Sequence, residues 1–218
     1  MKKIITISRE YGSGGHSIGK RVAELLNVPF YDKEIIDMSA KDSGLSPDFI
    51  RKTEQNISSG LLYTLLLGAS YAAPGTGSGV ASNQQACLNP PLADQVFNAQ
   101  RNVIINLAKK GPCVIVGRCA DYILTQSPEI DTNDLLNVFI YAPLQDKIKR
   151  AIEQKGLDPA TAEKDVKLID KRRANHYNTF TEQTWGKRCH YDLLINSSLF
   201  GLEKSAEFIV EAAKLACC

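Results

Sequence analysis

Four short and mainly apolar runs alternate along this chain with segments of helical periodicity. The runs are KIITIS (3–8), PCVIVGR (112–118), NVFIYA (137–142) and YDLLIN (191–196). Strands without a polar residue at every second position are typical of sheets that are buried on both faces. Since a parallel sheet between two layers of helices buries both faces, the pattern predicts an α/β fold with a doubly wound parallel sheet.

The segments between these runs favour helices. The apolar residues of 18–26 recur at i, i+4, i+7 and i+8, which predicts a helix that begins near Ser17. Pro143 is expected to open an amphipathic helix, and residues 201–216 have the pattern of a terminal helix. Residues 39–110 are expected to be a mostly helical insertion, and the Gly-, Ser- and Ala-rich residues 68–85 within it a mobile loop.

Composition narrows the classes of function. The chain has 218 residues, which is enough for one sizeable core, and its net charge of +2 does not favour nucleic acid as a partner. No apolar run is long enough to cross a bilayer, and MKKIITISRE does not resemble a secretory signal. The six cysteines form no CxxC pair, so we expect no metal site, no membrane partner and a reducing, cytoplasmic setting.

A glycine loop follows the first apolar run, in SREYGSGGHSIGKRVAE (8–24). Such a loop before a helix can turn successive backbone N–H groups and the positive end of the helix toward a phosphate. Aligned with a Walker loop, it places Arg9 at the first glycine, Gly15 at the lysine and His16 at the serine or threonine. The positive charge of the missing lysine could then come from Arg9, His16 or Lys20.

Two interpretations of this loop remain. It is a tight turn into a helix capped by Ser17, or it is a site for the phosphates of a nucleotide. The position of the loop after the first strand of an α/β chain favours the nucleotide site. Its predicted phosphate-binding residues are Arg9, Gly12, Ser13, Gly14, Gly15, His16 and Ser17.

Other polar residues follow the later apolar runs. Gly117-Arg118 follows the apolar residues of the second run, and Asn196-Ser197 follows those of the last run. Because parallel strands place their carboxyl ends on one edge, and ligands bind there, these residues should meet the glycine loop at that edge. Arg118 is therefore predicted to bind a ligand, and a salt bridge to a neighbouring helix is the alternative.

Several segments together resemble the cytidylate kinase-like family of P-loop proteins. They are ITISREYGSGGHSIGKRVAELLNVPFYDKEII, VIVGRCADYIL (114–124), DKRRANHYNTFTEQTWG (170–186) and YDLLINSSLFGLEKSAEFIV (191–210). The resemblance implies a nucleoside monophosphate kinase architecture, with ATP at the glycine loop. The helical insertion of residues 39–110 would close over the acceptor nucleotide, and an arginine-rich lid at residues 155–188 would cover the phosphates.

The resemblance also implies an acceptor site. Asp32 matches the segment that contacts the pyrimidine, with Lys33 beside it, and Arg101 and Arg118 match arginines that hold the acceptor. Several positions depart from the family pattern, and in the first of these segments Lys33 and Glu34 replace small residues. Met38 stands where a phosphate-binding arginine is expected, and Cys119 stands where an acidic residue is expected after Arg118.

The segment DKRRANHY offers charge for catalysis. Phosphoryl transfer needs positioning and positive charge around the transferred group, which Arg172 and Arg173 could supply with Asp170 to orient one of them. The alternative is a solvated helix face. Asp32 could hold magnesium through water, orient an arginine, or cap a helix.

The leading hypothesis is an ATP-dependent kinase that acts on a nucleoside monophosphate such as CMP or dCMP. Its cofactors would be ATP and Mg²⁺, with the metal held mainly by the nucleotide and water, and its partners small-molecule nucleotides. One alternative is a nucleotide-binding regulatory protein that has lost catalysis, which the missing lysine, Met38 and Cys119 favour. The other is a kinase for a different small metabolite.

Overall fold

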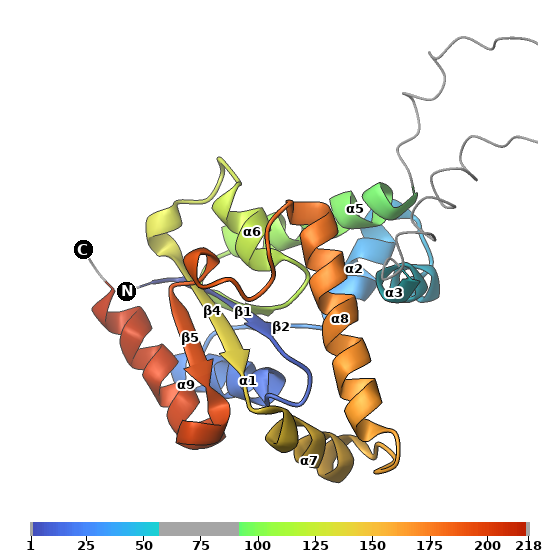
Figure 1. Ribbon diagram of the computed structural model, residues 1–218. Coiled ribbons are helices and arrows are strands. Elements are labelled where there is room, and N and C mark those ends of the chain that lie inside the picture. The colour runs from blue at the N-terminus through green and yellow to red at the C-terminus, as the bar shows by residue number, and fades with distance from the viewer. Residues whose placement is uncertain (1, 57–91, 217–218) are drawn as a thin grey trace, which may run out of the picture.

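A computed structural model describes residues 2–56 and 92–216 of the chain. Five parallel strands form one sheet in the order β2-β3-β1-β4-β5 (Figure 1). The strands are β1 (Ile4–Arg9), β2 (Phe30–Tyr31), β3 (Cys113–Val116), β4 (Leu135–Tyr141) and β5 (Leu193–Asn196). The predicted doubly wound parallel sheet is confirmed, and the predicted mobile loop 68–85 lies outside the described residues.

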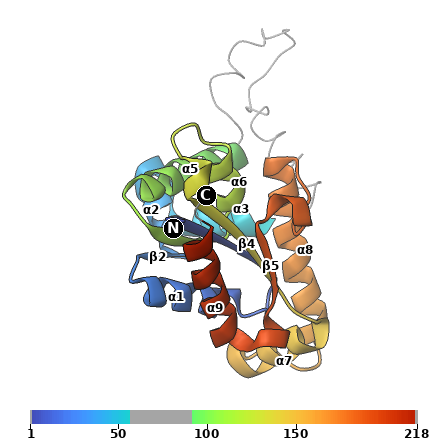
Figure 2. The ribbon, with the colours of Figure 1, turned by 90° about the vertical axis from the view of Figure 1, so that its left-hand side faces the viewer.

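Helices cover both faces of the sheet (Figure 2). Helices α1 (Gly15–Leu26) and α9 (Ser197–Leu215) pack together on one face. Helices α5 (Leu92–Lys109) and α6 (Ala120–Thr125) lie on the other, with α2 (Glu34–Ser43) against α5 and α3 (Pro47–Asn56) beside them. Helices α7 (Leu144–Lys155) and α8 (Ala162–Thr181) lie at the carboxyl edge of the strands.

Both sides of each central strand are buried, as the apolar runs predict. In β1, Ile5 and Ile7 face the core of α1 and α9, whereas Ile4 faces the core of α5 and α6. Thr6 is the polar exception in the middle of the strand, and its hydroxyl donates a hydrogen bond to Asn137 Oδ1 on β4 at 2.6 Å. Successive side chains of the strand point to opposite faces of the sheet. Because both faces are apolar, the sequence of the strand shows no alternation of polar and apolar residues.

Two helix boundaries differ from the sequence prediction. Helix α1 begins at Gly15 rather than near Ser17, and its N-cap is Gly14 with φ 80° and no side-chain cap among the described residues. Ser17 therefore does not cap it, because the left-handed glycine turns the chain one residue before the helix. Helix α9 begins at Ser197, and a kink at Gly201 (φ 75°) separates its first turn from the predicted terminal helix.

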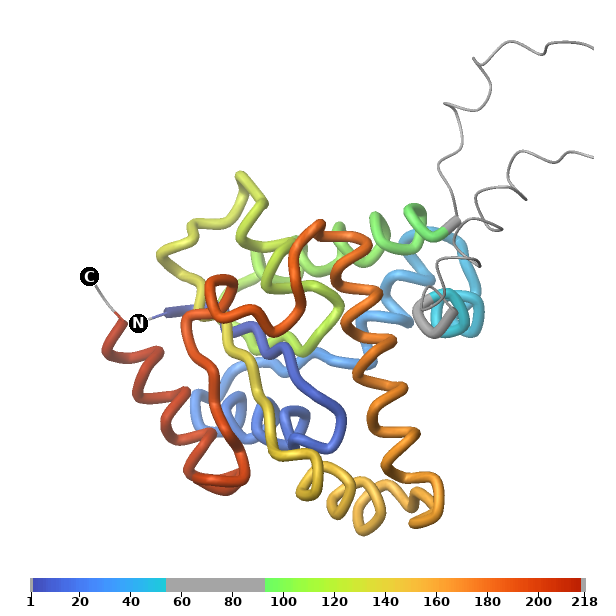
Figure 3. The backbone as a smooth tube through the Cα atoms, viewed as in Figure 1, coloured from blue at the N-terminus to red at the C-terminus, as the bar shows by residue number. Residues whose placement is uncertain are grey.

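Helix α8 runs beside the ends of the strands and closes the carboxyl edge (Figure 3). Arg173 Nη1 donates to the backbone oxygen of Arg9 at 2.9 Å, and the Tyr177 hydroxyl donates to Asp121 Oδ2 at 2.8 Å. The predicted lid, residues 155–188, contains this helix, and a lid role for it stays a prediction. Within the described part of the chain, no helix is long and apolar enough to cross a membrane.

Candidate functional site

The glycine loop is held between β1 and helices α7 to α9. The N–H of Tyr11 donates to Asp170 Oδ1 at 2.6 Å, and the Ser13 hydroxyl donates to the backbone oxygen of Glu10 at 2.8 Å. The Ser197 hydroxyl, from the end of β5, donates to the backbone oxygen of Ser13 at 2.6 Å. The predicted meeting of these strand ends on one edge is confirmed.

Close packing explains two of the loop glycines. A Cβ at Gly12 (φ +76°) would lie 3.0 Å from the Cα of Lys147 and closer still to its backbone oxygen. A Cβ at Gly14 (φ +80°) would clash with the side chain of Leu202. The loop therefore keeps its conformation because these two positions carry no side chain.

A cavity of about 290 Å³ lies over the loop, and we call it the loop cavity. The first turn of α1 faces it, and among the described residues of that turn none is acidic. Exposed N–H groups at an uncapped helix start attract anions. The loop cavity is lined by Arg9, Glu10, Tyr11, Gly12, Gly14, Gly15, His16, Ser17, Asp32, Lys33, Arg150, Gln154, Lys155 and Arg173.

Asp32 joins the loop to the neighbouring strand ends. Its Oδ1 accepts from Arg9 Nη2 at 3.3 Å and from Arg118 Nη1 at 3.4 Å, and its Oδ2 lies 2.7 Å from Nδ1 of His16. Burial raises the pKa of Asp32, but the charges of Arg9 and Arg118 and the hydrogen bond with His16 outweigh burial. The net pKa lies below the ordinary value, so Asp32 is an anion that orients cations.

The N-cap of α2 is Lys33, so Asp32 does not cap the helix. Both of its carboxylate oxygens contact other side chains, Oδ1 those of Arg9 and Arg118 and Oδ2 that of His16. A role of Asp32 in holding magnesium through water stays a prediction. Across the residues that the structure describes, no three His, Cys, Asp or Glu side chains gather to hold a metal ion.

The turn from β3 into α6 aims Arg118 at this cluster. Gly117, Arg118 and Cys119 all have positive φ, of 78°, 54° and 56°. For residues other than glycine this conformation costs on the order of 1–3 kcal/mol each. In this conformation Arg118 Nη1 donates to the backbone oxygen of Asp32 at 2.8 Å, so the strained turn places a charged side chain at the carboxyl edge.

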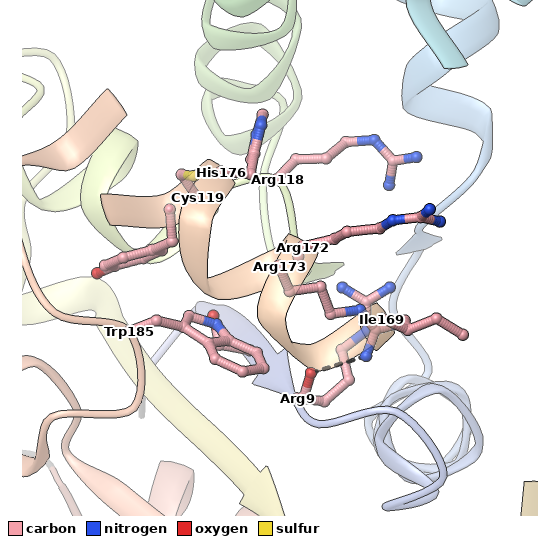
Figure 4. Close-up of a pocket in the computed structure, with 11 residues that line it drawn as sticks. Arg9, Arg118, Cys119, Ile169, Arg172, Arg173, His176 and Trp185 are labelled. Carbon is pink, nitrogen blue, oxygen red and sulfur yellow. Dashed lines mark hydrogen bonds between the residues drawn. The ribbon is translucent and has the colours of Figure 1, made fainter. Parts of the chain in front are cut away.

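A second cavity, of about 460 Å³, lies between this turn and α8, and we call it the arginine cavity. In Figure 4 the guanidinium groups of four arginines lie on one side of it, and Cys119, His176 and Trp185 lie on the other. The arginine cavity is lined by Ser8, Arg9, Gly117, Arg118, Cys119, Ile169, Arg172, Arg173, His176, Tyr177 and Trp185. Of the described residues, Arg9 and Arg173 are the two that line both cavities.

One face of α8 supplies five of these residues, at the helical spacing i, i+3, i+4, i+7 and i+8 from Ile169. Arg173 is buried, which lowers its pKa, while the charges of Asp170 and Asp32 act in the opposite direction. Arg172 has no hydrogen bond or ion pair with any described residue, and its buried Nε has no partner. A buried polar atom without a partner is costly, so Arg172 is suited to receive an anion.

Asp170 has a different set of partners from the one expected. Besides the N–H of Tyr11, its carboxylate accepts from Lys147 Nζ at 2.9 Å, and Lys147 Nζ also donates to Glu10 at 2.9 Å. Burial lowers the pKa of Lys147, but Asp170 and Glu10 outweigh burial and raise it. Asp170 therefore fixes the loop against α7 and α8, and it acts on Arg173 through its charge.

A model of the cytidylate kinase-like family matches residues 4–199. The chain belongs to the cytidylate kinase-like family. Its fold is accordingly that of the P-loop kinases, with the glycine loop after the first strand of a five-stranded parallel sheet.

Solved structures are also similar to the chain, whereas none of the curated proteins matches it. An uncharacterized protein from Eubacterium ventriosum has a TM-score of 0.67 and 27% identity, over 97% of this chain and 98% of that one. Shikimate kinase from Bacteroides thetaiotaomicron has a TM-score of 0.49 and 16% identity, over 97% and 98% of the two chains. Dephospho-CoA kinase from Campylobacter jejuni has a TM-score of 0.37 and 11% identity, over 97% of each chain.

Some residues expected from the family pattern lie elsewhere. Arg101 is not among the described residues that line either cavity. Met38 packs against the core of α5 and α6 and brings no charge. Lys33 lines the loop cavity rather than the arginine cavity, and the Ser13 hydroxyl is used inside the loop.

Besides Lys147, sequence reasoning missed three polar residues. Arg150 of α7 lines the loop cavity and donates to Ser197 Oγ at 3.1 Å and Ser198 Oγ at 3.2 Å. Asp121 is buried, which raises its pKa, and it accepts from Ser8 and Tyr177 below the arginine cavity. His176 could have been found from its helical spacing to Arg172 and Arg173, but Arg150 and Asp121 meet their partners only through the tertiary fold.

Proposed function

We propose that this member of the cytidylate kinase-like family catalyses ATP-dependent phosphoryl transfer to a nucleoside monophosphate, with CMP or dCMP as the acceptor. The observation that carries the proposal is the sharing of Arg9 and Arg173 by two adjoining cavities, one over the glycine loop and one lined by arginines. A donor and an acceptor bound in such cavities would meet at the shared arginines.

The loop cavity is the proposed ATP site. The uncapped start of α1 offers backbone N–H groups to the phosphates, and no described residue of its first turn is acidic. Arg150, Gln154 and Lys155 line the same cavity from α7 and would extend the site away from the phosphates. This arrangement supports binding of a polyphosphate without the usual lysine.

The arginine cavity is the proposed acceptor site. Arg9, Arg118, Arg172 and Arg173 line it, and Asp32 accepts hydrogen bonds from Arg9 and Arg118. Four guanidinium groups at one cavity favour an acceptor that is itself an anion, because arginine forks match phosphate oxygens. A nucleoside monophosphate satisfies this requirement, and a neutral alcohol does not.

The reaction would be a direct displacement. An oxygen of the acceptor phosphate would attack the γ-phosphorus, and the bond from that phosphorus to the bridging oxygen of ADP would break. Mg²⁺ would be held mainly by the nucleotide and water, and it would neutralise charge on the phosphates of ATP. The arginines of the chain would position the two phosphates and stabilise the charge on the transferred group.

A coupled assay of ADP release with CMP, dCMP, UMP and non-nucleotide acceptors tests this function. We expect turnover with CMP or dCMP and a loss on the order of a thousandfold or more when Arg172→Ala and Arg173→Ala are combined. Lys171→Ala is the matched control, because Lys171 is exposed on the same turn of α8. Micromolar ATP binding without turnover on any acceptor would instead favour a regulatory protein.

A further inference from the structure

Arg9 and Gly15 compete for the same space. A Cβ at Gly15 would lie 2.5 Å from the Cβ of Arg9 and 2.9 Å from its Cγ. Real Cβ atoms do not approach this closely, and Arg9 Cβ is fixed to the backbone of β1, so it cannot move aside. A lysine at position 15 is therefore incompatible with an arginine at position 9.

The rest of the Arg9 side chain runs from the glycine loop to the end of β3. A Cβ at Gly117 would lie 3.0 Å from Cζ of Arg9 and would overlap its Nη1. Beyond this glycine, Nη2 donates to Asp32 Oδ1 at 3.3 Å. Two glycines thus make room for one arginine, and a carboxylate fixes its end.

This path places Arg9 where the two cavities adjoin. Arg9 and Arg173 are the two residues common to both linings, and Arg173 Nη1 donates to the backbone oxygen of Arg9 at 2.9 Å. The other candidates for the missing charge are placed differently. His16 is half-exposed against Asp32, and Lys20 is absent from the described residues that line either cavity. Lys33, Arg150 and Lys155 line the loop cavity but not the arginine cavity.

We propose that Arg9 takes the place of the Walker lysine and holds the phosphoryl group as it passes from the loop cavity to the arginine cavity. The cation comes from the end of β1, at the position of the first Walker glycine, instead of from the start of α1. Gly15 and Gly117 are glycines because Arg9 fills the space above them. The inference rests on the proposed function for its catalytic part, whereas its steric part does not depend on any ligand.

The steric part is tested by exchanging the two positions. Arg9→Gly combined with Gly15→Lys produces the Walker spacing of a glycine, four residues, and a glycine-lysine pair. With Arg9 Cβ removed, the nearest described neighbour of the new Cβ is Ile140 Cβ at 3.4 Å, an ordinary contact. The matched control is Arg9→Ala combined with Gly15→Lys, which keeps the offending Cβ.

Melting temperatures without nucleotide give the first readout. We expect Gly15→Lys alone and the Arg9→Ala, Gly15→Lys pair to melt well below the Arg9→Gly, Gly15→Lys pair, by roughly 2–4 °C for each kcal/mol of strain. Equal melting temperatures for the three variants would show that Arg9 does not exclude a side chain at position 15, and would overturn the steric part.

ADP release gives the second readout. We expect Arg9→Ala to lose on the order of a thousandfold in kcat, as removal of an arginine at the transferred phosphoryl group does. The Arg9→Gly, Gly15→Lys pair should exceed Arg9→Gly alone by at least about tenfold, since each tenfold is only 1.36 kcal/mol of the barrier. A folded Arg9→Ala variant with turnover within about threefold of wild type, roughly half of the 1.36 kcal/mol that a tenfold change represents, would overturn the catalytic part and leave the proposed function standing.

The two failures are distinguishable. Absence of turnover by the wild-type protein with every acceptor would refute the proposed function and with it the catalytic role of Arg9. The melting temperatures would then still decide whether Arg9 and Gly15 exclude each other. A folded exchange pair with no more turnover than Arg9→Gly would refute the replacement of the lysine by Arg9.

Discussion

The loop cavity and the arginine cavity adjoin at Arg9 and Arg173, but different parts of the chain build their walls. Three glycines of the loop and the start of α1 line the loop cavity, where they let backbone N–H groups and neighbouring segments come close. Side-chain charge dominates the arginine cavity, where strained residues after β3 and one face of α8 deliver guanidinium groups. A side chain added to the loop should therefore lower stability, whereas a side chain removed from α8 should lower turnover.

The largest expected effect is on turnover and comes from the arginine cavity. Arg172→Ala should lower kcat on the order of a thousandfold and leave the melting temperature nearly unchanged, because Arg172 makes no hydrogen bond with any described residue. An assay of ADP release measures the loss in kcat, and thermal unfolding measures the melting temperature of the same variant. A large loss of stability in this variant would mean that the arginine cavity is built for folding rather than for a ligand.

The loop cavity should respond through stability. Gly12→Ala should lower the free energy of unfolding by roughly 3–5 kcal/mol, because it adds a Cβ against the backbone of Lys147 in a left-handed conformation. Gly14→Ala, at a similar φ, meets the flexible side chain of Leu202 and should cost less. Denaturant unfolding of both variants measures the difference in their free energies of unfolding. Equal losses in the two variants would show that a backbone neighbour is no more restrictive than a side-chain neighbour.

Asp32 lies between the two cavities, and its change should give a pH-dependent effect. Asp32→Asn should lower the free energy of unfolding at neutral pH by about 3 kcal/mol, because Arg9 and Arg118 lose a buried counterion. A folded-state pKa below the ordinary value means that this stabilisation exists above pH about 4 and is lost as the pH falls through the folded pKa. Unfolding curves of wild type and variant should therefore converge in acid. A constant difference down to pH 2 would contradict the assignment of Asp32 as the anion of the cluster.

The smallest effect is expected far from both cavities. Gly44→Ala, at the end of α2, changes a glycine with φ +73° that has no described atom within 4 Å of the new Cβ. It should cost about 1 kcal/mol, the conformational penalty alone. Since φ at Gly12 is +76°, subtracting this value from the loss in Gly12→Ala isolates the close contact with Lys147. A Gly44→Ala loss as large as that of Gly12→Ala would remove the argument that packing shapes the loop.

Local patterns in the sequence predicted the layers and the edge where the site lies. The apolar runs predicted four strands of a parallel sheet, and the glycines after the first run predicted a turn into a helix. The short strand Phe30–Tyr31 is not among the four predicted runs, and the start of α1 was misplaced because Gly14, not Ser17, turns the chain. Such predictions succeed for secondary structure that depends on residues close together in the sequence, within one or two helical turns.

The candidate site was predicted less completely. Arg9, Arg118, Arg172 and Arg173 were identified from their positions after strands or in a charged segment, and the structure brings all four to one cavity. Arg101 was grouped with them by resemblance, although it is not among the described residues that line either cavity. Lys147 and Arg150 were missed, because nothing near them in sequence distinguishes them from other basic residues of an amphipathic helix.

By itself the sequence determined that the chain forms a parallel sheet with a glycine turn after its first strand, because strand burial and turn conformation are properties of short segments. Only the tertiary structure decided that Arg9 lies over both Gly15 and Gly117 and ends at Asp32. Arg9 and Gly117 are 108 positions apart in the chain, and their contact follows from the parallel pairing of β1 with β3, which aligns Ile7 with Val116. Excluded volume between such distant residues leaves no periodic pattern in a single sequence, so it appears only when the strands are paired.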